Sequence, residues 1–489
     1  MLFSSYKNRS DYSFRFEVAP LSITVAILMV QFFIFKDYTP HIPLIIGICI
    51  TGIFMALKGR KWAEMEKNMY RVMKVALPTT IIILCVGMMI AASIAAGTVQ
   101  TVLKFGLDII SPSIFLPATC ILTTIVSLAT GTSWGTLGTV GLAMLGIGDA
   151  LGIPNYWTIG AICSGSFFGD KMSPLSDTTN LTPAVAGTDV WSHIKSMLPN
   201  TTVAYTLTII IYALVSRHYQ GDAGEIANQT RAMFQTAIAG HYKTGFITLV
   251  PALFVIAMGF RKYSVTGTLC TGIFLAVLIA VCYQGESISR VSDILMNGYK
   301  AQTDQEYVDK LLSKGGIMSM TWVITMMMLS LAFIGALETY GTFRAILGKL
   351  KVLIKSRFSL VATTAMIVLT VGMVAGEIYT SLVLPGRLMK SKYAEMGYDR
   401  AILSRTIEDW GTIVSPLIPW NNGGVFVTTT LGLSTFIYAP FALFCWLSPA
   451  VGLIFAALGW FVPKDPHGPQ TIDDEEMEEI ADDVDDYMV

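Results

Sequence analysis

Long apolar stretches recur through most of this chain, and they constrain its fold more than any other feature. The hydrocarbon core of a bilayer, about 30 Å thick, needs an apolar helix of about 20 residues. Only 14% of the 489 residues are charged, against about 25% in soluble domains. The chain is therefore predicted to be a membrane protein. Its spans are expected at residues 17–35, 40–57, 73–99, 198–217, 242–260, 264–283, 316–337 and 435–462.

Basic residues predict how the chain is oriented in the cell membrane. Three of them precede the first span, and six more lie in the connection 58–74, which we interpret as a loop. Lysine and arginine mark the cytoplasmic side, so the N-terminal segment 1–16 and this loop are expected inside. Ten of the 34 acidic residues lie between positions 473 and 486. The segment 463–489 is therefore expected to be a disordered tail, and both termini are expected in the cytoplasm.

Two apolar regions are interrupted by glycine and hydroxyl residues. The region 114–150 contains GTSWGT at 131–136, and the region 358–386 contains GEIYTS at 376–381. Each is predicted to be a re-entrant hairpin of two half-helices. Irregular backbone at membrane depth is tolerated only where protein or a water-filled cavity satisfies its polar groups. Both turns are therefore expected in such surroundings.

A broken span follows each hairpin. The two interruptions read FGDKMSPLSDTTN at 168–180 and WGTIVSPLIPWNN at 410–422. At a separation of 242 residues, Ser-Pro-Leu matches Ser-Pro-Leu and Asn180 matches Asn422. This internal repeat indicates that the chain consists of two related halves.

The repeat leads to a predicted architecture. Each half is expected to hold three spans, a short amphipathic helix (101–112 or 341–355), a hairpin, a broken span and a closing span. Five crossings per half is an odd number, so the second half must run inverted relative to the first. The predicted fold class is an all-α polytopic membrane protein with two inverted repeats, about ten spans and two hairpins. The segments are a cytoplasmic N-terminus (1–16), a first transport repeat (17–217), an external connection (218–241), a second, inverted transport repeat (242–462) and the acidic tail (463–489).

Paired broken helices are typical of secondary transporters. Half-helix ends near the midplane of the membrane attract anions at their N-termini and coordinate cations at their C-termini. Hydroxyl, amide and carboxylate oxygens suit a small, hard cation. We therefore predict sodium as the transported or coupling ion. The predicted ligands are Thr132, Ser133, Thr136, Asp170, Ser173, Ser176, Asp177, Thr178 and Asn180.

Asp177 and Asp170 each have two interpretations. A bare carboxylate inside a membrane is costly, so Asp177 is expected to meet a cation or to carry a proton. Its alternative role is that of N-cap for the half-helix that follows it. Asp170 adjoins Lys171, so a plain ion pair between the two is an alternative to ion binding.

The second half differs in its acids. In the alignment at 242 residues, Asp177 corresponds to Pro419, whereas the second hairpin carries Glu377 where the first offers Thr132. Burial in an apolar setting favours the protonated form of a carboxyl group, so Glu377 is predicted to couple protons, together with Asp177. The alternative is a permanent ion pair of Glu377 with Arg387 or Arg405.

Other polar residues of the broken regions complete the predicted site. Glu408 and Asp409 follow Arg400 and Arg405, and interface ion pairing is favoured over transport chemistry for both acids. Lys171 is a candidate anchor for a substrate carboxylate if neither aspartate neutralises it. The predicted second or substrate site comprises Lys171, Thr380, Ser381, Ser415, Trp420, Asn421 and Asn422.

Other function classes fit the sequence less well. A membrane hydrolase would need a nucleophile with its base or a metal-ligand set, and the sequence has neither an HExxH nor a GxSxG motif. We therefore expect no enzyme activity and no cofactor other than the sodium ion. A channel would need a continuous pore, whereas broken, inverted repeats favour alternating access.

The interrupted segments also resemble a known family. GTSWGTLGTVG, SGSFFGDKMSPLSDTTN, GEIYTSLVLPGR and EDWGTIVSPLIPWN are similar to the motifs of NhaC-type sodium/proton antiporters, and the resemblance covers most of residues 17–462. It implies a sodium/proton antiporter, and a homodimer by analogy. The alternative is sodium- and proton-coupled exchange of a small carboxylate, such as malate or lactate, or of an amino acid. The expected partners are the lipid bilayer, sodium, protons and, in that alternative, an organic anion; no nucleic acid is expected.

Overall fold

The computed structural model is built almost entirely of helices. It describes residues 13–35, 39–74, 77–109, 111–174, 176–219, 236–237, 240–261, 263–303, 305, 308–309, 312–350, 354–466 and 468–469. Within these residues, an isolated β-bridge joins Tyr398 and Lys464, and no longer strand forms. Most of the predicted N-terminal segment 1–16, the external connection 218–241 and the tail 463–489 lies outside the described residues.

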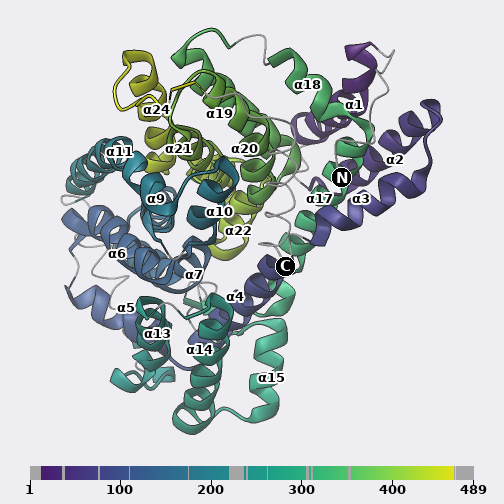
Figure 1. Ribbon diagram of the computed structural model, residues 1–489. Helices are drawn as coiled ribbons and strands as arrows, with labels where there is room; N and C mark the ends of the chain where they lie inside the picture. Colours follow the sequence, from purple (N-terminus) through teal and green to yellow (C-terminus); the bar gives the residue numbers. More distant parts are fainter. Residues whose placement is uncertain are drawn as a thin grey trace.

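The helices follow one another closely along the chain (Figure 1). The first group comprises α1 (Phe14–Phe33), α2 (His41–Leu57), α3 (Trp62–Lys74), α4 (Leu77–Ala95), α5 (Thr98–Ile109), η1 (Pro112–Ile114), α6 (Phe115–Thr130), α7 (Ser133–Thr136), η2 (Leu137–Gly141), α8 (Leu142–Ala150), α9 (Asn155–Met172), α10 (Asp177–Ala186) and α11 (Val190–His218). The second group comprises α13 (Phe246–Phe260), α14 (Val265–Ile279), η3 (Ala280–Gln284), α15 (Ile288–Asn297), η4 (Ile317–Met320), α17 (Thr321–Tyr340), α18 (Thr342–Leu350), α19 (Arg357–Ala375), α20 (Ile378–Glu395), α21 (Arg400–Gly411), η6 (Ser415–Leu417), α22 (Asn422–Leu431), α23 (Thr435–Tyr438), η7 (Ala439–Phe441) and α24 (Leu443–Leu458).

Most predicted spans coincide with helices, and the predicted amphipathic pieces are α5 and α18. Two predictions are wrong. The basic connection 58–74 is not a loop, because it contains α3, which packs against α17. The last predicted span, 435–462, is divided into α23, η7 and α24, because Pro440 interrupts the run of backbone hydrogen bonds there.

The lengths and composition of the helices are those of a multi-pass membrane protein. Among the described residues, four helices are long and apolar enough to cross a membrane alone: Phe14–Gln31, Val190–His218, Thr266–Gln284 and Ile317–Tyr340. A fifth candidate is the segment Arg400–Leu431 with Thr435–Phe441, whose two parts are bent by 96°. Further apolar helices, such as α2, α6, α19 and α24, are shorter.

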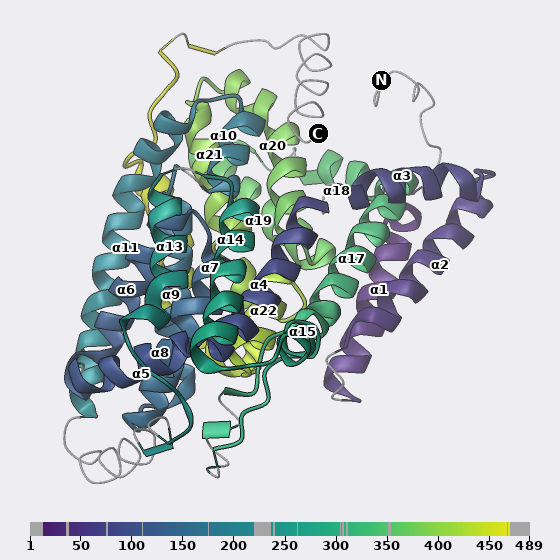
Figure 2. The same cartoon turned by 90° about the horizontal axis from the view of Figure 1, so that it is seen from below.

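The helices gather in two groups, and α17 joins them because it packs against α2 and α3 and also against α19 and α22. Figure 2 shows α6, α9 and α11 side by side, and α1, α2 and α17 standing together at the other side of the molecule. The later helices α20, α21 and α24 pack among the earlier helices α9, α10 and α11. Segments far apart in the sequence therefore build one common core.

At both predicted hairpin turns one helix ends at a glycine and another begins directly after it. Gly131 after α6 has φ 67°, and Gly376 after α19 has φ 63°. This left-handed conformation favours glycine, because a side chain would clash with the backbone. The glycines thus end one helix and let the chain enter the next one, α7 or α20.

Both predicted breaks form as well. The helix α9 ends at Met172 because Ser173, which precedes Pro174, is extended with ψ 123°; a residue before proline avoids the helical region. The chain resumes as α10 after four residues. The second break, between α21 and α22, is longer and contains the short η6. Each break thus leaves helix ends inside the helical core.

The first break is held against the first hairpin by close packing of α9 on α6. Gly169 provides the room for this approach. A Cβ atom at this position would lie 2.6 Å from Thr124 O and 2.6 Å from Leu128 N of α6. Both are backbone atoms, which cannot move aside as a flexible side chain does.

We predict that Gly169→Ala destabilises the protein by about 1–3 kcal/mol, the usual range for overpacking. The measurement is the midpoint of thermal unfolding in detergent. Gly240→Ala is the matched control, because no atom of the described residues lies within 4 Å of a Cβ placed there. An unfolding midpoint of Gly169→Ala equal to that of the wild type would contradict the close contact.

Candidate functional site

The residue after each hairpin glycine caps the helix that follows. Thr132 Oγ1 accepts a hydrogen bond from Gly135 N at 3.3 Å, and Glu377 Oε2 accepts one from Thr380 N at 2.7 Å. Both satisfy backbone donors that the start of a helix leaves free. The two tips therefore share their construction, but only the second carries a carboxyl group.

Asp170, in the last turn of α9, reaches the first hairpin tip. Its Oδ2 accepts hydrogen bonds from Ser133 N at 3.1 Å and from Ser133 Oγ at 2.7 Å. Its Oδ1 is buried and has no hydrogen-bond partner among the described residues. No lysine or arginine nitrogen of the described chain forms an ion pair with Asp170. A buried carboxylate oxygen without a donor is unfavourable, and a cation would satisfy it.

Asp177 is the first residue of α10 and is exposed at the break. Its Oδ1 accepts a hydrogen bond from Thr178 N at 2.9 Å, and its Oδ2 accepts one from Tyr379 of the second hairpin. The alternative in which Asp177 is the N-cap is wrong, since Ser176 holds that position. Asp177 thus connects the first break to α20.

The other predicted sodium ligands near this break are bonded mainly to one another and to backbone. Thr178 Oγ1 lies 3.1 Å from Ser176 Oγ. The Asn180 side chain donates to Pro174 O at 2.9 Å and to Ser176 O at 2.6 Å. Ser173 Oγ donates to Leu128 O at 2.8 Å. These contacts fix the shape of the break around the two aspartates.

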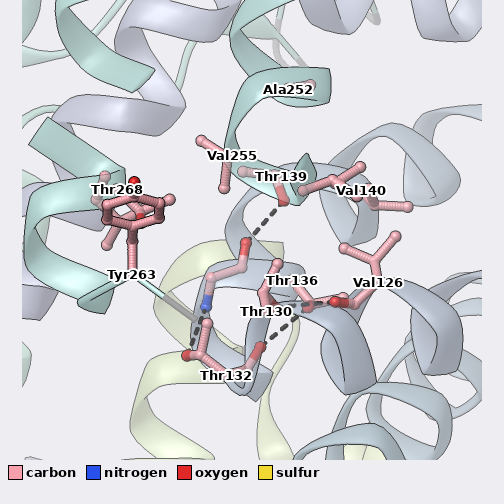
Figure 3. A pocket seen from close by; sticks show the side chains of 13 residues that line it. Val126, Thr130, Thr132, Thr136, Thr139, Val140, Ala252, Val255, Tyr263 and Thr268 are labelled. Carbon is pink, nitrogen blue, oxygen red and sulfur yellow. Dashed lines mark hydrogen bonds between the residues drawn. The ribbon is translucent and has the colours of Figure 1, made fainter. Parts of the chain in front are cut away.

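Thr132 and Thr136 face away from this group, so the predicted ligands fall into two sets. Both line a separate cavity of about 30 Å³ between the first hairpin and the helices α13 and α14 (Figure 3). The Thr136 hydroxyl donates to Thr132 O at 2.9 Å. The buried Thr268 hydroxyl, also in the lining, has no partner among the described residues. The cavity has room for a water molecule.

Lys171 is fully buried, and its partner is not the one expected. Its Nζ lies 2.5 Å from Asp409 Oδ1 and 2.8 Å from Ser448 Oγ. Asp409 also accepts a hydrogen bond from Asn200 Nδ2 at 2.7 Å. The proposed ion pair of Asp170 with Lys171 is therefore wrong. Because Asp409 neutralises Lys171, the geometry does not favour the lysine as a free anchor for a substrate carboxylate.

The sequence favours interface ion pairing for Glu408, but the structure places this residue in the core. It is fully buried, and its oxygens lie 3.1 Å from Thr178 Oγ1 and 2.6 Å from Thr182 Oγ1. No basic nitrogen of the described chain lies within 4.0 Å of it. Arg405 instead donates to the carbonyl oxygens of Ser196 and Phe461. Glu408 is thus a buried acid beside the first break.

Glu377 is buried in the second hairpin tip. Besides capping α20, it accepts a hydrogen bond from Asn422 Nδ2 at 3.3 Å. Asn422 N in turn donates to Gly376 O at 2.8 Å. The alternative of an ion pair with Arg387 or Arg405 is wrong, because no such pair forms in the described chain. The second break is therefore bonded to its own hairpin, as the first one is.

The remaining predicted residues of the second half bond to backbone carbonyls near the hairpin and the break. Thr380 contributes its backbone N–H to Glu377. The side-chain bonds run from Ser381 Oγ to Ile378 O (2.6 Å), from Ser415 Oγ to Thr412 O (2.7 Å), from Trp420 Nε1 to Met373 O (2.6 Å) and from Asn421 Nδ2 to Gly372 O (3.0 Å).

The two breaks correspond differently from the sequence alignment. The helices after the breaks begin at Asp177 and Asn422, and their N-caps are Ser176 and Asn421. Asp177 therefore corresponds to Asn422 and not to Pro419. The separation is 245 residues, which is also the separation of Gly131 and Gly376. The longer second break shifts the register after the shared Ser-Pro-Leu.

We predict that Lys171→Met destabilises the protein by about 3–5 kcal/mol, because it leaves Asp409 charged and unpaired in the core. Adding Asp409→Asn should restore most of this loss, since the amide still accepts from Ser448 or Asn200. The measurement is thermal unfolding in detergent. Lys195→Met, at an exposed position of α11, is the control. Equal midpoints for the single and double variants would contradict the pairing.

Comparison with known proteins agrees with the resemblance found in the sequence. The model of the Na+/H+ antiporter family matches residues 165–460. The Na+/H+ antiporter NhaC of Alkalihalophilus pseudofirmus is 36% identical over 92% of this chain and 96% of its own length. The arginine/ornithine antiporter ArcD of Halobacterium salinarum is 32% identical over 90% of both chains. The malate-2H+/Na+-lactate antiporter of Bacillus subtilis is 32% identical over 89% of this chain and 92% of its own. The chain belongs to the Na+/H+ antiporter family.

Proposed function

We propose that this chain exchanges sodium for protons across the cell membrane by alternating access. The observation that carries the proposal is the Asp170 carboxylate, which is 5% exposed and has one oxygen without a donor at a helix break. Such a group in a membrane-embedded core is a functional site in most transporters, because its burial is costly without a partner. Membership of the family supports sodium and protons as the exchanged ions.

Sodium is assigned to the first break. Asp170 and the hydroxyl of Ser133 supply the central oxygens, with Ser173, Ser176, Asp177 and Asn180 around them. The exposed Asp177 lies at the entrance, where its charge attracts cations. Thr132 and Thr136 border the neighbouring cavity and are assigned to the path of the ion.

Proton coupling is assigned chiefly to Glu377. Its carboxyl lies in the tip of the second hairpin, its contacts are neutral donors, and no ion pair fixes its charge within the described chain. A proton can therefore neutralise the carboxylate of Glu377 when the site changes from facing one side of the membrane to facing the other. The second break, with Asn421, Asn422 and Trp420, orients this tip.

We also propose the finer topology: about ten spans and two re-entrant hairpins in two inverted repeats, with both termini in the cytoplasm. The equal construction of the hairpin tips, 245 residues apart, supports this arrangement. The homodimer stays a prediction from the resemblance.

The function is tested in proteoliposomes that contain a pH-sensitive dye. External sodium should raise the internal pH of vesicles with the wild-type protein. Asp170→Asn should lower the apparent sodium affinity about 10- to 100-fold, the effect of losing a charged ligand. Asp293→Asn, at an exposed position of α15, is the control.

If Asp170→Asn shows a sodium-driven pH change with the sodium affinity of the wild type, Asp170 is not part of the sodium site. No pH change in the wild type would contradict antiport itself. Parallel measurements with malate, lactate and amino acids test exchange of an organic substrate, to which the names of two relatives point.

The topology predicts opposite access to the two hairpin tips. After replacement of the seven native cysteines, Thr132→Cys should react with an impermeant thiol reagent from outside and Thr380→Cys from inside. Lys61→Cys marks the cytoplasmic side. Reaction of both tips from one side in every ionic condition would contradict the inverted repeats.

A further inference from the structure

Glu408 is a buried acid that the proposed exchange does not yet use. Two consecutive acids of α21 point to different partners, because neighbouring residues of a helix lie about 100° apart around its axis. Asp409 is satisfied by Lys171, Ser448 and Asn200. Glu408 faces α10, and its contacts are the hydroxyls of Thr178 and Thr182. A carboxyl of this kind lacks the positive partner that its neighbour has.

The hydroxyls around Glu408 come from two helices. Thr178 and Thr182 lie one turn apart on α10. Thr412 lies one turn after Glu408 and faces its carboxyl. The Thr412 hydroxyl is 1% exposed and has no hydrogen-bond partner among the described residues. One carboxylate and three hydroxyls therefore meet in a buried space, and one of the hydroxyls is free to bind a ligand.

The hydrogen bonds of Thr182 point to a missing positive charge. Its Oγ1 lies 2.6 Å from Glu408 Oε2 and 2.6 Å from Thr178 O. A hydroxyl has one hydrogen, so it can donate fully to only one of these acceptors. In the other short contact, the Thr182 oxygen faces a second oxygen with no threonine hydrogen between them. A positive charge among these oxygens, either a bound cation or a proton on Glu408, would relieve it.

The surroundings provide no such cation. The helices α10, α11, α19, α20 and α24 pack against α21. The ionisable residues of these helices include Asp177, His193, Lys390, Tyr393 and Cys445, and the charge of Lys171 on α9 also acts on Glu408. Within the described residues, no basic nitrogen lies within 4.0 Å of Glu408. Glu408 is connected to the first break through Thr178, whose Oγ1 lies 3.1 Å from Ser176 Oγ.

We propose that Glu408, Thr178, Thr182 and Thr412 form a second cation site that takes sodium, next to the site at Asp170. Carboxylate and hydroxyl oxygens are ligands that a small, hard cation prefers. Thr178, which the sequence assigns to the first site, belongs to this second one by its contacts. The inference rests on the proposed function, because it places a further ion on the same sodium path.

The test is equilibrium binding of radioactive sodium to the purified protein in detergent. The wild type should bind about two ions per chain, and Glu408→Gln should bind about one, because the amide keeps the contacts with both threonines but removes the charge. Asp170→Asn should also bind about one. Glu395→Gln, which alters an exposed acid, should bind as the wild type does. Maximal binding and affinity of Glu408→Gln equal to those of the wild type would overturn the second site.

A second variant keeps the test decisive if Glu408→Gln does not fold. Thr412→Val removes a hydroxyl that forms no well-aligned hydrogen bond within the described residues. It should weaken sodium binding at one of the two sites about 3- to 10-fold, the usual effect of one lost polar contact. Wild-type binding at both sites would contradict the proposal.

Transport separates this inference from the proposed function. If wild-type vesicles exchange sodium for protons while Glu408→Gln keeps full sodium binding, the second site alone is wrong. If wild-type vesicles show no exchange, antiport is wrong, whatever the number of bound ions.

Discussion

The buried ion pair of Lys171 and Asp409 holds together the elements on which the site depends. It joins the last turn of α9 to α21, and Ser448 of α24 and Asn200 of α11 complete it. Each charge has hydrogen-bonding partners besides the other, Ser448 for Lys171 and Ser448 and Asn200 for Asp409, and such additional bonds help a core to tolerate an ion pair. Asp170 precedes Lys171, and Glu408 precedes Asp409. The ion pair therefore places Asp170 at the first broken region and Glu408 at the second. Neither acid forms an ion pair within the described residues.

Much of the fold could be predicted from local chemistry. Gly131 and Gly376 end their helices because only glycine takes the left-handed conformation without strain, and Ser173 leaves the helix because proline follows it. These signals depend on residues that are adjacent in the sequence, so they can be recognised without the structure. The segment 435–462 contains a signal for its division, which is Pro440. Its strongly apolar composition nevertheless favours one unbroken span, and the prediction follows the composition.

The candidate site could be predicted only in part. The sequence indicated that Asp170, Asp177 and Glu377 lie beside the interruptions, and each lies at or next to a helix end. It could not indicate that Lys171 bonds to a residue 238 positions away. It also could not separate Glu408 from Asp409, since that requires knowing which helices pack on each face of α21. The spacing of Thr178 and Thr182, one helical turn apart, was the available signal for a polar face opposite Glu408.

The contact between Tyr379 and Asp177 links the second hairpin to the first break. Tyr379 belongs to the first turn of the second hairpin helix, and Asp177 begins the helix after the first break. A shift of either helix must break or carry along this hydrogen bond. An exchanger dissipates the ion gradient if its binding site is open to both sides of the membrane at once. In the proposed exchange, a direct bond between these two helices opposes such a leak, because a displacement of one helix is transmitted to the other.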